Sequence, residues 1–415
     1  MSEWQKIKIS KIADFNTESV NKNFKHYTIE YIDTSSVEEG RLVNTQKILL
    51  KEAPSRAKRR VKENDILISS VRPNLKHFYF VNHCKDNTIV STGFVVITPK
   101  KATDPKFLYY LLTTDSYTQY LTQVANSHTS TYPSFNPDVI ANSVLPIPPL
   151  EEQKAIASVL SCLDEKIENL RKQNETLEAI AQTLFKHWFI DFEFPNDDGK
   201  PYKSSGGEMV ASELGEIPKG WQVGKLGKEV ETMGGGTPST KEPSYWENGD
   251  IPWYSPTDLT KSGALFSLDS EKKITKLGLK KSSAKLFPAY SLLLTSRATV
   301  GVISINTKPS CTNQGFITII PNKKFSVYYL YGWLLTKIEL VKLLASGSTF
   351  PEISKSNFRD LDLTVATEEI LDRYSQLVNP IFQKIELNTN QIQTLTKTRD
   401  ALLPKLMSGK IRVKE

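Results

Sequence analysis

The chain has 415 residues and a formal net charge of +7, from 53 Lys and Arg against 46 Asp and Glu, a surplus that permits a polyanionic partner without requiring one. Its 39% hydrophobic and 10% aromatic residues exclude a disordered chain, and its length predicts two or more domains. Three cysteines lie far apart with no CxxC pair, which excludes a zinc ribbon and a disulfide-stapled secreted protein.

The first part of the chain, residues 1–149, predicts a β-rich domain. It opens with MSEWQKIKIS, which has no apolar h-region, so we expect no signal peptide. No run of about 18 apolar residues occurs, so we expect no membrane span and a cytoplasmic protein. Short apolar runs between turn residues, such as residues 65–68, predict strands.

Basic residues gather in this domain at residues 51–62, where Glu52 is the one acidic residue. Because affinity for DNA comes largely from neutralising phosphates, this cluster predicts a DNA contact; a solvated surface is the alternative. Arg72 follows the apolar run and is a further candidate, because arginine binds guanine or phosphate; a surface ion pair is the alternative. The candidate residues of this domain are Lys51, Arg56, Lys58, Arg59, Arg60 and Arg72.

A long helix is predicted at residues 150–192. Pro148 and Pro149 precede it, and Glu151 and Glu152 lie in its first turn, where the helix dipole favours negative charge. Its apolar positions alternate steps of three and four, which is a coiled-coil seam with one Asn in it. The seam consists of Ile156, Leu160, Leu163, Ile167, Leu170, Asn174, Leu177, Ala181, Leu184 and Trp188.

Residues 193–217 are rich in Gly, Pro, Ser and charged residues and predict a linker. A second β-rich domain is predicted at residues 218–367, with an apolar run at residues 292–294. It has its own basic cluster at residues 271–285 and an arginine after the apolar run, with the same alternatives as in the first domain. The candidate residues here are Lys272, Lys273, Lys276, Lys280, Lys281 and Arg297.

The last part, residues 368–415, predicts a second long helix with a similar seam. Pro380 and Pro404 lie inside it and predict a kink or a break. Arg399 would lie opposite Leu163 in the paired seams, so we expect its side chain to extend out to water. The seam consists of Tyr374, Val378, Ile381, Ile385, Asn388, Ile392, Leu395, Arg399, Leu402 and Leu406.

The two halves of the chain repeat each other in order. Trp4 recurs as Trp221, and residues 130–133 recur as residues 348–351, an offset of 218 residues that continues without a gap through the long helices. The repeat predicts an α+β fold: two similar mixed α/β domains, related by pseudo-twofold symmetry and separated by two long helices.

The single Asn in each seam predicts how the helices pair. With Asn174 facing Asn388, the helices form an antiparallel coiled coil in which the numbers of facing residues sum to 562. A buried Asn costs less opposite another Asn, so this register is favoured over slips. The alternative is that each helix packs on its own domain and both Asn residues face water. The nearest facing pairs in the register are Leu170 with Ile392 and Ile167 with Leu395.

A rigid spacer of this length has a consequence for recognition. A helix of about 38 residues spans roughly 57 Å, which exceeds one DNA turn of about 34–36 Å. Two domains held apart in this way predict two half-sites separated by an unread gap. Because the two domains differ in sequence, we expect the half-sites to differ as well.

Several segments resemble the specificity subunit of Type I restriction-modification systems, and together they cover essentially the whole chain. Each segment alone is weak evidence, but the ordered set is specific to that family. The segments are residues 54–56, 65–69, 145–154, 184–189, 214–221, 235–239 and 403–411.

The resemblance implies a non-catalytic subunit that binds double-stranded DNA, with each target-recognition domain reading one half of a bipartite asymmetric site. It implies that the long helices bind two modification (methyltransferase) subunits, and that restriction (translocase and nuclease) subunits join for cleavage. S-adenosylmethionine, ATP and Mg would then belong to the partner subunits, and this chain would hold no cofactor and no metal.

Two other functions are also compatible with parts of the sequence. The first is a stand-alone nuclease or methyltransferase, which predicts turnover by the purified chain. Against it, the sequence has no GxxxxGK[ST] loop, no HExxH and no Cys/His metal cluster, and Asn379-Pro380 continues as Ile381 rather than as the second proline of an adenine methyltransferase. The second is a coiled-coil scaffold that does not touch DNA, which predicts no salt-dependent DNA binding.

Overall fold

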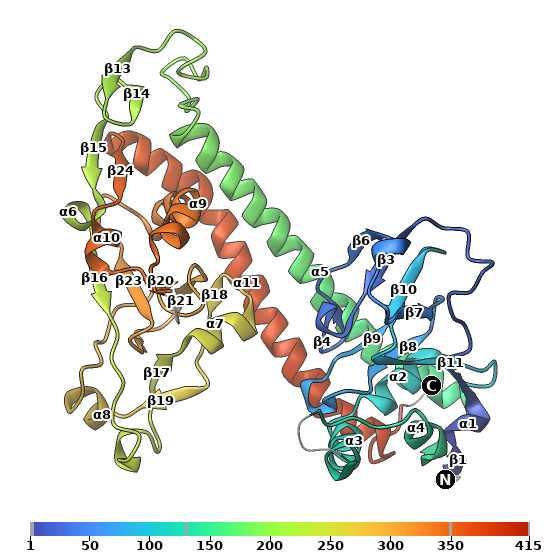
Figure 1. Ribbon diagram of the computed structural model, residues 1–415. Coiled ribbons are helices and arrows are strands. Elements are labelled where there is room, and N and C mark those ends of the chain that lie inside the picture. Colours follow the sequence, from blue (N-terminus) through green and yellow to red (C-terminus); the bar gives the residue numbers. More distant parts are fainter. Residues whose placement is uncertain (1–3, 129–131, 348–350, 414–415) are drawn as a thin grey trace. The chain divides into compact units, whose positions relative to one another are not determined.

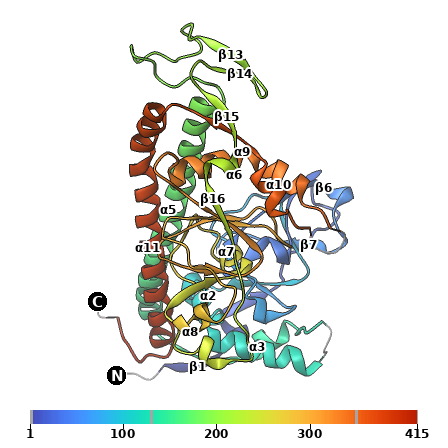
Figure 2. The ribbon, with the colours of Figure 1, turned by 90° about the vertical axis from the view of Figure 1, so that its left-hand side faces the viewer.

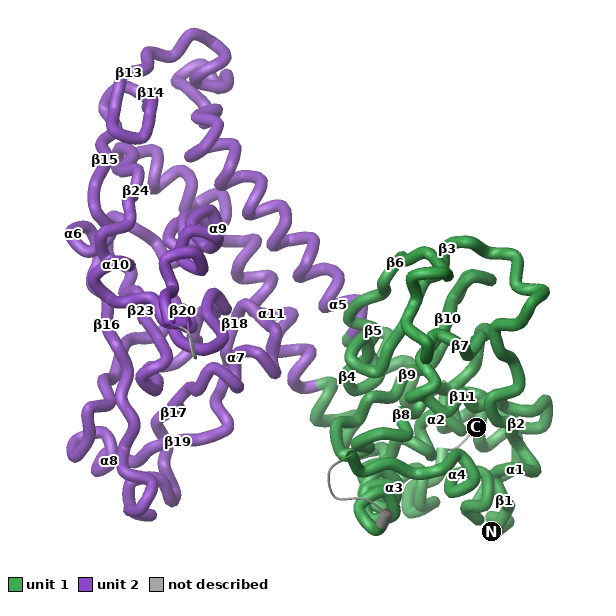
Figure 3. The backbone as a smooth tube through the Cα atoms, in the orientation of Figure 1, with its two compact units in different colours: residues 1–167, 395–415 green, residues 168–394 purple. Residues whose placement is uncertain are grey.

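The computed structural model describes residues 4–128, 132–347 and 351–413, so the repeated segments at 130–133 and 348–351 lie mostly outside the described residues. The chain divides into two compact units, residues 1–167 with 395–415 as unit 1 and residues 168–394 as unit 2 (Figure 3). Both unit boundaries fall inside long helices, so each unit combines one mixed α/β body with parts of both helices. Every helix in the described ranges is too short or too polar to span a membrane.

The two long helices, α5 (Leu150–Phe189) and α11 (Glu368–Met407), each have 40 residues, and their first residues are 218 positions apart (Figure 1). Both end before the predicted limits. Phe192 follows α5 in a left-handed conformation with φ 61°, and Gly409 follows α11 with φ 69°. A left-handed residue after the last turn is a common way to terminate a helix.

Helix α11 continues through both prolines, which corrects the predicted break. Pro380 and Pro404 are exposed, as are the residues four positions earlier, Gln376 and Asp400. A proline inside a helix deprives the carbonyl four residues earlier of its hydrogen bond. Because those carbonyls belong to the solvent-facing side, water can satisfy them and the helix persists.

The Asn residues of the two seams meet inside unit 2, in the register predicted from the sequence. Asn388 is fully buried, and its Nδ2 donates to Asn174 Oδ1 at 2.9 Å. Asn174 Nδ2 in turn donates to Thr389 Oγ1 at 3.4 Å. The alternative, with both Asn residues facing water, does not occur. Figure 2 shows α5 and α11 side by side along this pairing.

In unit 1 the opposite ends of the two helices meet, near the beginning of α5 and the end of α11. Arg399 does not simply extend to water: its Nη1 donates to Asp164 Oδ1 at 2.8 Å, one residue from the predicted partner Leu163. Ile156 and Leu406, a predicted facing pair, are both buried in the same hydrophobic core. Within each unit, therefore, the helices run antiparallel.

The body of unit 1 contains two four-stranded sheets, with strand orders β6-β3-β10-β7 and β2-β11-β8-β9, and a two-stranded β1-β12 ribbon. The central strands are rich in Val, Ile and Leu and are buried on both faces. The elements are β1 (Gln5–Lys8), α1 (Ile9–Ile12), β2 (Ala13–Phe15), β3 (Thr28–Ile32), β4 (Val37–Glu38), β5 (Arg41–Leu42), β6 (Gln46–Leu49), β7 (Ala57–Arg60), β8 (Ile66–Ser69), β9 (Phe78–Phe80), β10 (Thr88–Ser91), β11 (Phe94–Pro99), α2 (Pro105–Leu112), α3 (Asp115–His128), α4 (Asp138–Asn142) and β12 (Val144–Ile147).

The body of unit 2 has a five-stranded sheet, β16-β23-β20-β21-β18, a three-stranded sheet, β19-β17-β22, and a β15-β24 ribbon. Its elements are β15 (Gln222–Lys225), α6 (Leu226–Glu229), β16 (Glu231–Gly234), β17 (Ile251–Tyr254), α7 (Pro256–Ser262), β18 (Phe266–Ser267), β19 (Lys272–Ile274), α8 (Lys276–Lys280), β20 (Leu292–Thr295), β21 (Ile303–Asn306), β22 (Cys311–Thr312), β23 (Phe316–Ile320), α9 (Val327–Leu344), α10 (Lys355–Arg359) and β24 (Asp362–Val365).

The two bodies share one topology. The strand order β2-β11-β8-β9 of unit 1 recurs as β16-β23-β20-β21 in unit 2, and β6-β3-β10 recurs as β19-β17-β22. Strand directions agree as well, because β10 is parallel to β3 and β22 is parallel to β17, whereas β6 and β19 are antiparallel to those central strands. The repeat predicted from the sequence is thus a repeat of the fold.

The segment predicted as a linker is folded. It contains the antiparallel hairpin of β13 (Met209–Ser212) and β14 (Gly215–Pro218). Before the hairpin, the Phe194 ring is buried between Tyr202 and Trp221, with ring centroids 4.6 and 5.2 Å away. Composition indicated a flexible segment because Gly, Ser and charged residues outnumber the few aromatic residues that fix it to unit 2.

Candidate nucleic-acid interface

The first basic cluster lies on and beside an edge strand of a unit 1 sheet. Lys51 belongs to a short 3-10 turn (Leu50–Glu52) after β6, Arg56 precedes β7, and Lys58 lies on β7. The side chains of these three residues are exposed. Exposed cations on one surface suit a polyanionic partner.

Two arginines of this cluster are engaged inside the unit, which the sequence did not reveal. Arg59 Nη1 donates to Asn16 Oδ1 at 2.6 Å and also to the Phe94 carbonyl, and burial lowers the pKa of its guanidinium. Arg60 forms an ion pair with Glu18 at 3.3 Å and lies over the ring of Phe24. These contacts hold β7 against neighbouring segments, so Arg59 is a structural anchor.

The second basic cluster lies in unit 2, on β19, on α8 and in the loop that follows. Lys273 is half-buried and forms an ion pair with Asp269 at 2.9 Å. The other lysines are exposed, and they are Lys272, Lys276, Lys280, Lys281 and Lys285. Their spacing over a short helix and its flanks gives a dense positive surface, which suits a polyanion.

The two clusters occupy equivalent places in the two bodies. Cluster 51–62 follows β6 and precedes β8, and cluster 271–285 begins at β19 and precedes β20. Because β6 matches β19 and β8 matches β20 in the shared topology, the two clusters lie in matching stretches of the chain, although the first includes strand β7 and the second begins on β19 itself. The in-phase recurrence seen in the sequence is therefore a recurrence in position within each unit.

The two candidate arginines after the apolar strands do not occupy equivalent positions. The backbone N–H of Arg72 donates to the Pro133 carbonyl at 2.8 Å, and the corresponding bond in unit 2 runs from Ala298 to Pro351 at 3.0 Å. Arg72 therefore matches Ala298, and Arg297 lies one residue earlier in its loop. The sequence alone could not show this, because the offset is 226 residues here rather than 218.

The surroundings of the two arginines also differ. The Arg72 guanidinium lies 5.4 Å from the ring centre of Tyr132, an exposed aromatic residue that the sequence did not single out. Arg297 forms an ion pair with Glu352, with Nε 3.7 Å from Oε2, and the two side chains are 54% and 48% exposed. The surface ion pair considered from the sequence is thus what Arg297 has in the unbound chain, and such exposed pairs contribute little to stability.

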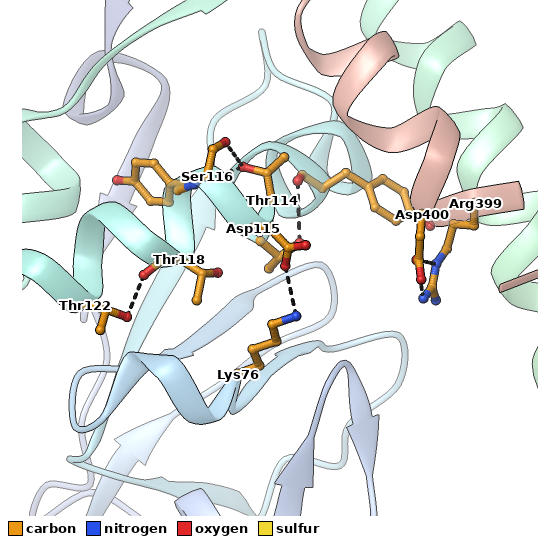
Figure 4. A network of polar contacts seen from close by, with 11 residues as sticks. Lys76, Thr114, Asp115, Ser116, Thr118, Thr122, Arg399 and Asp400 are labelled. Carbon is orange, nitrogen blue, oxygen red and sulfur yellow. Dashed lines mark hydrogen bonds and ion pairs between the residues drawn. The ribbon is translucent and has the colours of Figure 1, made fainter. Parts of the chain in front are cut away.

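A polar network supports the loop that carries Arg72. Lys76, at the end of this loop, forms an ion pair with Asp115 at the start of α3, with Nζ 2.8 Å from Oδ1 (Figure 4). The Asp115 carboxylate raises the pKa of Lys76, and the charge of Asp400 on α11 adds to this effect. Asp115 lies in the first turn of α3, where the helix dipole favours a carboxylate, and this placement is the signal in the sequence that could have indicated it.

Titratable side chains are a further feature of the described residues. No group of three or more His, Cys, Asp and Glu side chains is arranged there to hold a metal ion. The strongly shifted groups are mostly tyrosines, such as Tyr110, whose hydroxyl donates to Asp164 at 2.6 Å and whose pKa is raised mainly by burial. These tyrosines are buried or partly buried, and their raised pKa values follow mainly from that burial.

Comparisons with known proteins agree with the repeated two-domain fold. The family model described as "Type I restriction modification DNA specificity domain" matches residues 1–179 and 218–397. The Type I restriction enzyme HindI specificity subunit of Haemophilus influenzae is 29% identical, over 99% of this chain and 100% of its own length. The MjaIX specificity subunit of Methanocaldococcus jannaschii is 34% identical, over 81% of this chain and 76% of its own. The Type I restriction-modification S subunit from M. genitalium shares the fold, with TM-score 0.58 at 18% identity over 97% of this chain and 96% of its own.

Proposed function

The chain belongs to the Type I restriction-modification specificity-subunit family, whose role is DNA recognition, and from this premise we propose that its two units each read one half of a bipartite, asymmetric DNA site. The observation that carries the proposal is the shared topology with different side chains at matching loops. Both units place a basic cluster at the same connection, but unit 1 presents Arg56 and Lys58 where unit 2 presents a run of lysines. Because the two units share one topology but present different side chains, they suit half-sites of different sequence.

Within this proposal the long helices bind two methyltransferase subunits, and restriction subunits join for cleavage. Large apolar side chains on the exposed faces of the helices support a docking role, because water disfavours them there. Within unit 2 these are Ile180, Leu377 and Leu387, which are 44%, 43% and 51% exposed.

We further assign all catalysis to the partner subunits. S-adenosylmethionine, ATP and Mg would bind to those partners in the cytoplasm, and this chain would contribute the DNA contacts and their spacing. The rival assignment, a stand-alone methyltransferase, is tested by incubating the purified chain with S-adenosylmethionine and DNA. Methyl transfer in the absence of partner subunits would contradict our assignment.

The proposal is tested by mapping methylated bases in a host that lacks the system, after expression of the chain with its methyltransferase subunit. We expect one bipartite motif that disappears when the chain is omitted. Exchanging residues 1–149 for the corresponding domain of another family member should change one half of the motif and leave the other half intact. The matched control exchanges residues 218–367 and should change the opposite half. A change in both halves after either exchange would contradict the division between the units.

A further inference from the structure

The loops after β8 and β20 are built from the same backbone hydrogen bonds. In unit 1, Ser70 N donates to the Gly93 carbonyl at 2.8 Å, and Phe135 N donates to the Ser70 carbonyl at 3.0 Å. In unit 2, Ser296 N donates to the Gly315 carbonyl at 2.8 Å, and Ile353 N donates to the Ser296 carbonyl at 3.1 Å. The bonds from Arg72 and Ala298 complete the set, so three segments of each unit meet at one junction.

Each junction contains a residue other than glycine in a left-handed conformation. Arg72 has φ 48° and Ala298 has φ 62°. A side chain in this region crowds the following carbonyl, so the conformation is costly and persists only where surrounding contacts impose it. Strained backbone of this kind is concentrated at binding and catalytic sites, and here it occurs at matching positions in both units.

Each junction also carries one exposed arginine, and its side chain lies beside another exposed side chain. That second side chain comes from the segment after α3 in unit 1 and from the segment after α9 in unit 2. Arg72 lies beside Tyr132, and Arg297 lies beside Glu352. When the two loops are aligned by their hydrogen bonds, Arg297 lies one position before the residue that matches Arg72, so the two units do not present identical side-chain arrangements. Both units share a loop fixed by the same backbone hydrogen bonds that carries one arginine.

This inference rests on the proposed function, under which the two units read different sequences. A loop with the same backbone in both units, each with one arginine, suits a contact that does not depend on sequence. DNA offers the same phosphate at every position, and phosphate contacts set the register of a protein on the duplex without specifying bases. We propose that the loops after β8 and β20 each bind one DNA phosphate, through Arg72 in unit 1 and Arg297 in unit 2. Base reading then falls to the parts of each unit that differ.

Glu352 gives this proposal a distinctive consequence. In the unbound chain the Glu352 carboxylate forms an ion pair with Arg297. A phosphate that binds Arg297 must displace this carboxylate and is repelled by its negative charge. Removing this carboxylate with Glu352→Gln should therefore tighten binding to DNA of any sequence. Glu339→Gln is the matched control, because Glu339 is exposed on α9 and pairs with Lys342 instead.

The test uses the full chain assembled with its methyltransferase subunits and two duplexes, one carrying the methylated motif recovered by mapping and one of shuffled sequence. Arg72→Ala and Arg297→Ala should each weaken binding to both duplexes by the same factor, about five-fold near 0.1 M salt. Each should also make the negative slope of log K against log salt shallower by about 0.9. Arg→Lys variants should retain the slope, because lysine also binds phosphate. Lys101→Ala and Lys323→Ala, in the matching loops before α2 and α9, are the controls.

The outcomes separate this inference from the proposed function on which it rests. Weaker binding to the motif duplex only, with an altered methylated motif, would assign these arginines to base reading and overturn the inference. Losses no larger than those of the lysine controls would overturn it too. If the wild-type complex fails to prefer the motif duplex, the proposed function itself fails. Arg72→Gly provides a folding control, because glycine favours the left-handed conformation, and it should lose as much affinity as Arg72→Ala.

Discussion

Trp4 in unit 1 and Trp221 in unit 2 hold the same place in the repeated frame, directly before β1 and β15, but they pack against different chemistry. In unit 1 the Trp4 Nε1 donates to Glu152 at 3.1 Å, and the Arg412 guanidinium lies 5.3 Å from the Trp4 ring centre. Arg412 also donates to both oxygens of Glu152 at 2.6 Å. An ion pair therefore joins the first turn of α5 to the segment that follows α11 in unit 1.

Unit 2 achieves the same junction with aromatic rings. Phe194, which lies 218 residues before Arg412, stacks on Trp221, and Ile370 replaces Glu152 at the matching position of the helix. Phe189 lies between Trp221, Tyr329 and Tyr374, with ring centroids 4.9 to 5.7 Å away. One backbone frame therefore supports two kinds of contact at this junction, ionic in unit 1 and aromatic in unit 2.

The largest expected effect comes from truncating the aromatic layer. Phe189→Ala should lower the free energy of unfolding by about 4 kcal/mol, because it leaves a cavity among rings that cannot close around it. Met407→Ala, at the matching position of unit 1, should cost about 2.5 kcal/mol. Urea unfolding of the two variants measures both losses in the free energy of unfolding. Equal losses would mean that the aromatic layer around Phe189 contributes no more to stability than the contacts of Met407.

The Asn pair should show strong coupling. Asn174→Leu leaves the fully buried Asn388 amide without its 2.9 Å partner and should cost about 2 kcal/mol. Adding Asn388→Leu removes the stranded amide and forms an apolar pair, so the double variant should regain most of that loss. The measurement is a double-mutant cycle in urea. Losses that add in the double variant would show that the two amides do not depend on each other.

The ion pair of Arg399 with Asp164, a second ionic contact between the helices of unit 1, should respond to salt, whereas the aromatic layer of unit 2 should not. Arg399→Ala removes the partner of Asp164 and should cost about 1–2 kcal/mol at low salt, because both side chains are only partly buried. The difference from the wild type should shrink as salt is added. The loss from Phe189→Ala should stay constant over the same range, and a matching salt dependence would contradict the contrast.

The smallest expected effect concerns pH and unit 2. Burial raises the pKa of Glu178, whose carboxylate accepts a hydrogen bond from the Tyr331 hydroxyl at 3.2 Å. A raised pKa in the folded state means that the folded chain holds this proton more tightly, so its contribution is complete below pH 4.5 and is lost as pH rises through the raised value. Glu178→Gln should remove that decline. Melting temperatures of the variant and the wild type should diverge as pH rises above about 4.5, and parallel curves would contradict this assignment.

Periodicity made the helices and their register predictable. The three-four spacing predicted the paired helices, and one Asn per seam fixed their register, because only one of the antiparallel alignments brings both amides together. The 218-residue offset gave the repeated fold, because it holds through the helices without insertions. These features depend on local spacing, which a sequence displays directly.

What the sequence could not show depends on tertiary contacts. Arg59 looked like its exposed neighbours, but Asn16 and the Phe94 carbonyl lie far from it along the chain. Arg72 and Arg297 looked equivalent because each follows an apolar strand, whereas the hydrogen bonds place them one residue apart. Pro380 predicted a kink or a break because proline removes a helix hydrogen bond. Its place off the seam, between Val378 and Ile381, already indicated the outer face, where water can satisfy the freed carbonyl.

The central claim is that each unit reads its half-site independently of the other. The most direct test replaces the unit 2 segment between β15 and β24, residues 226–361, with the unit 1 segment between β1 and β12, residues 9–143, so that one recognition body is present twice. Methylation mapping with the partner methyltransferase should then give a motif with the same half-sequence at both ends. A motif that retains the original second half, from a chain that folds and assembles, would contradict the claim.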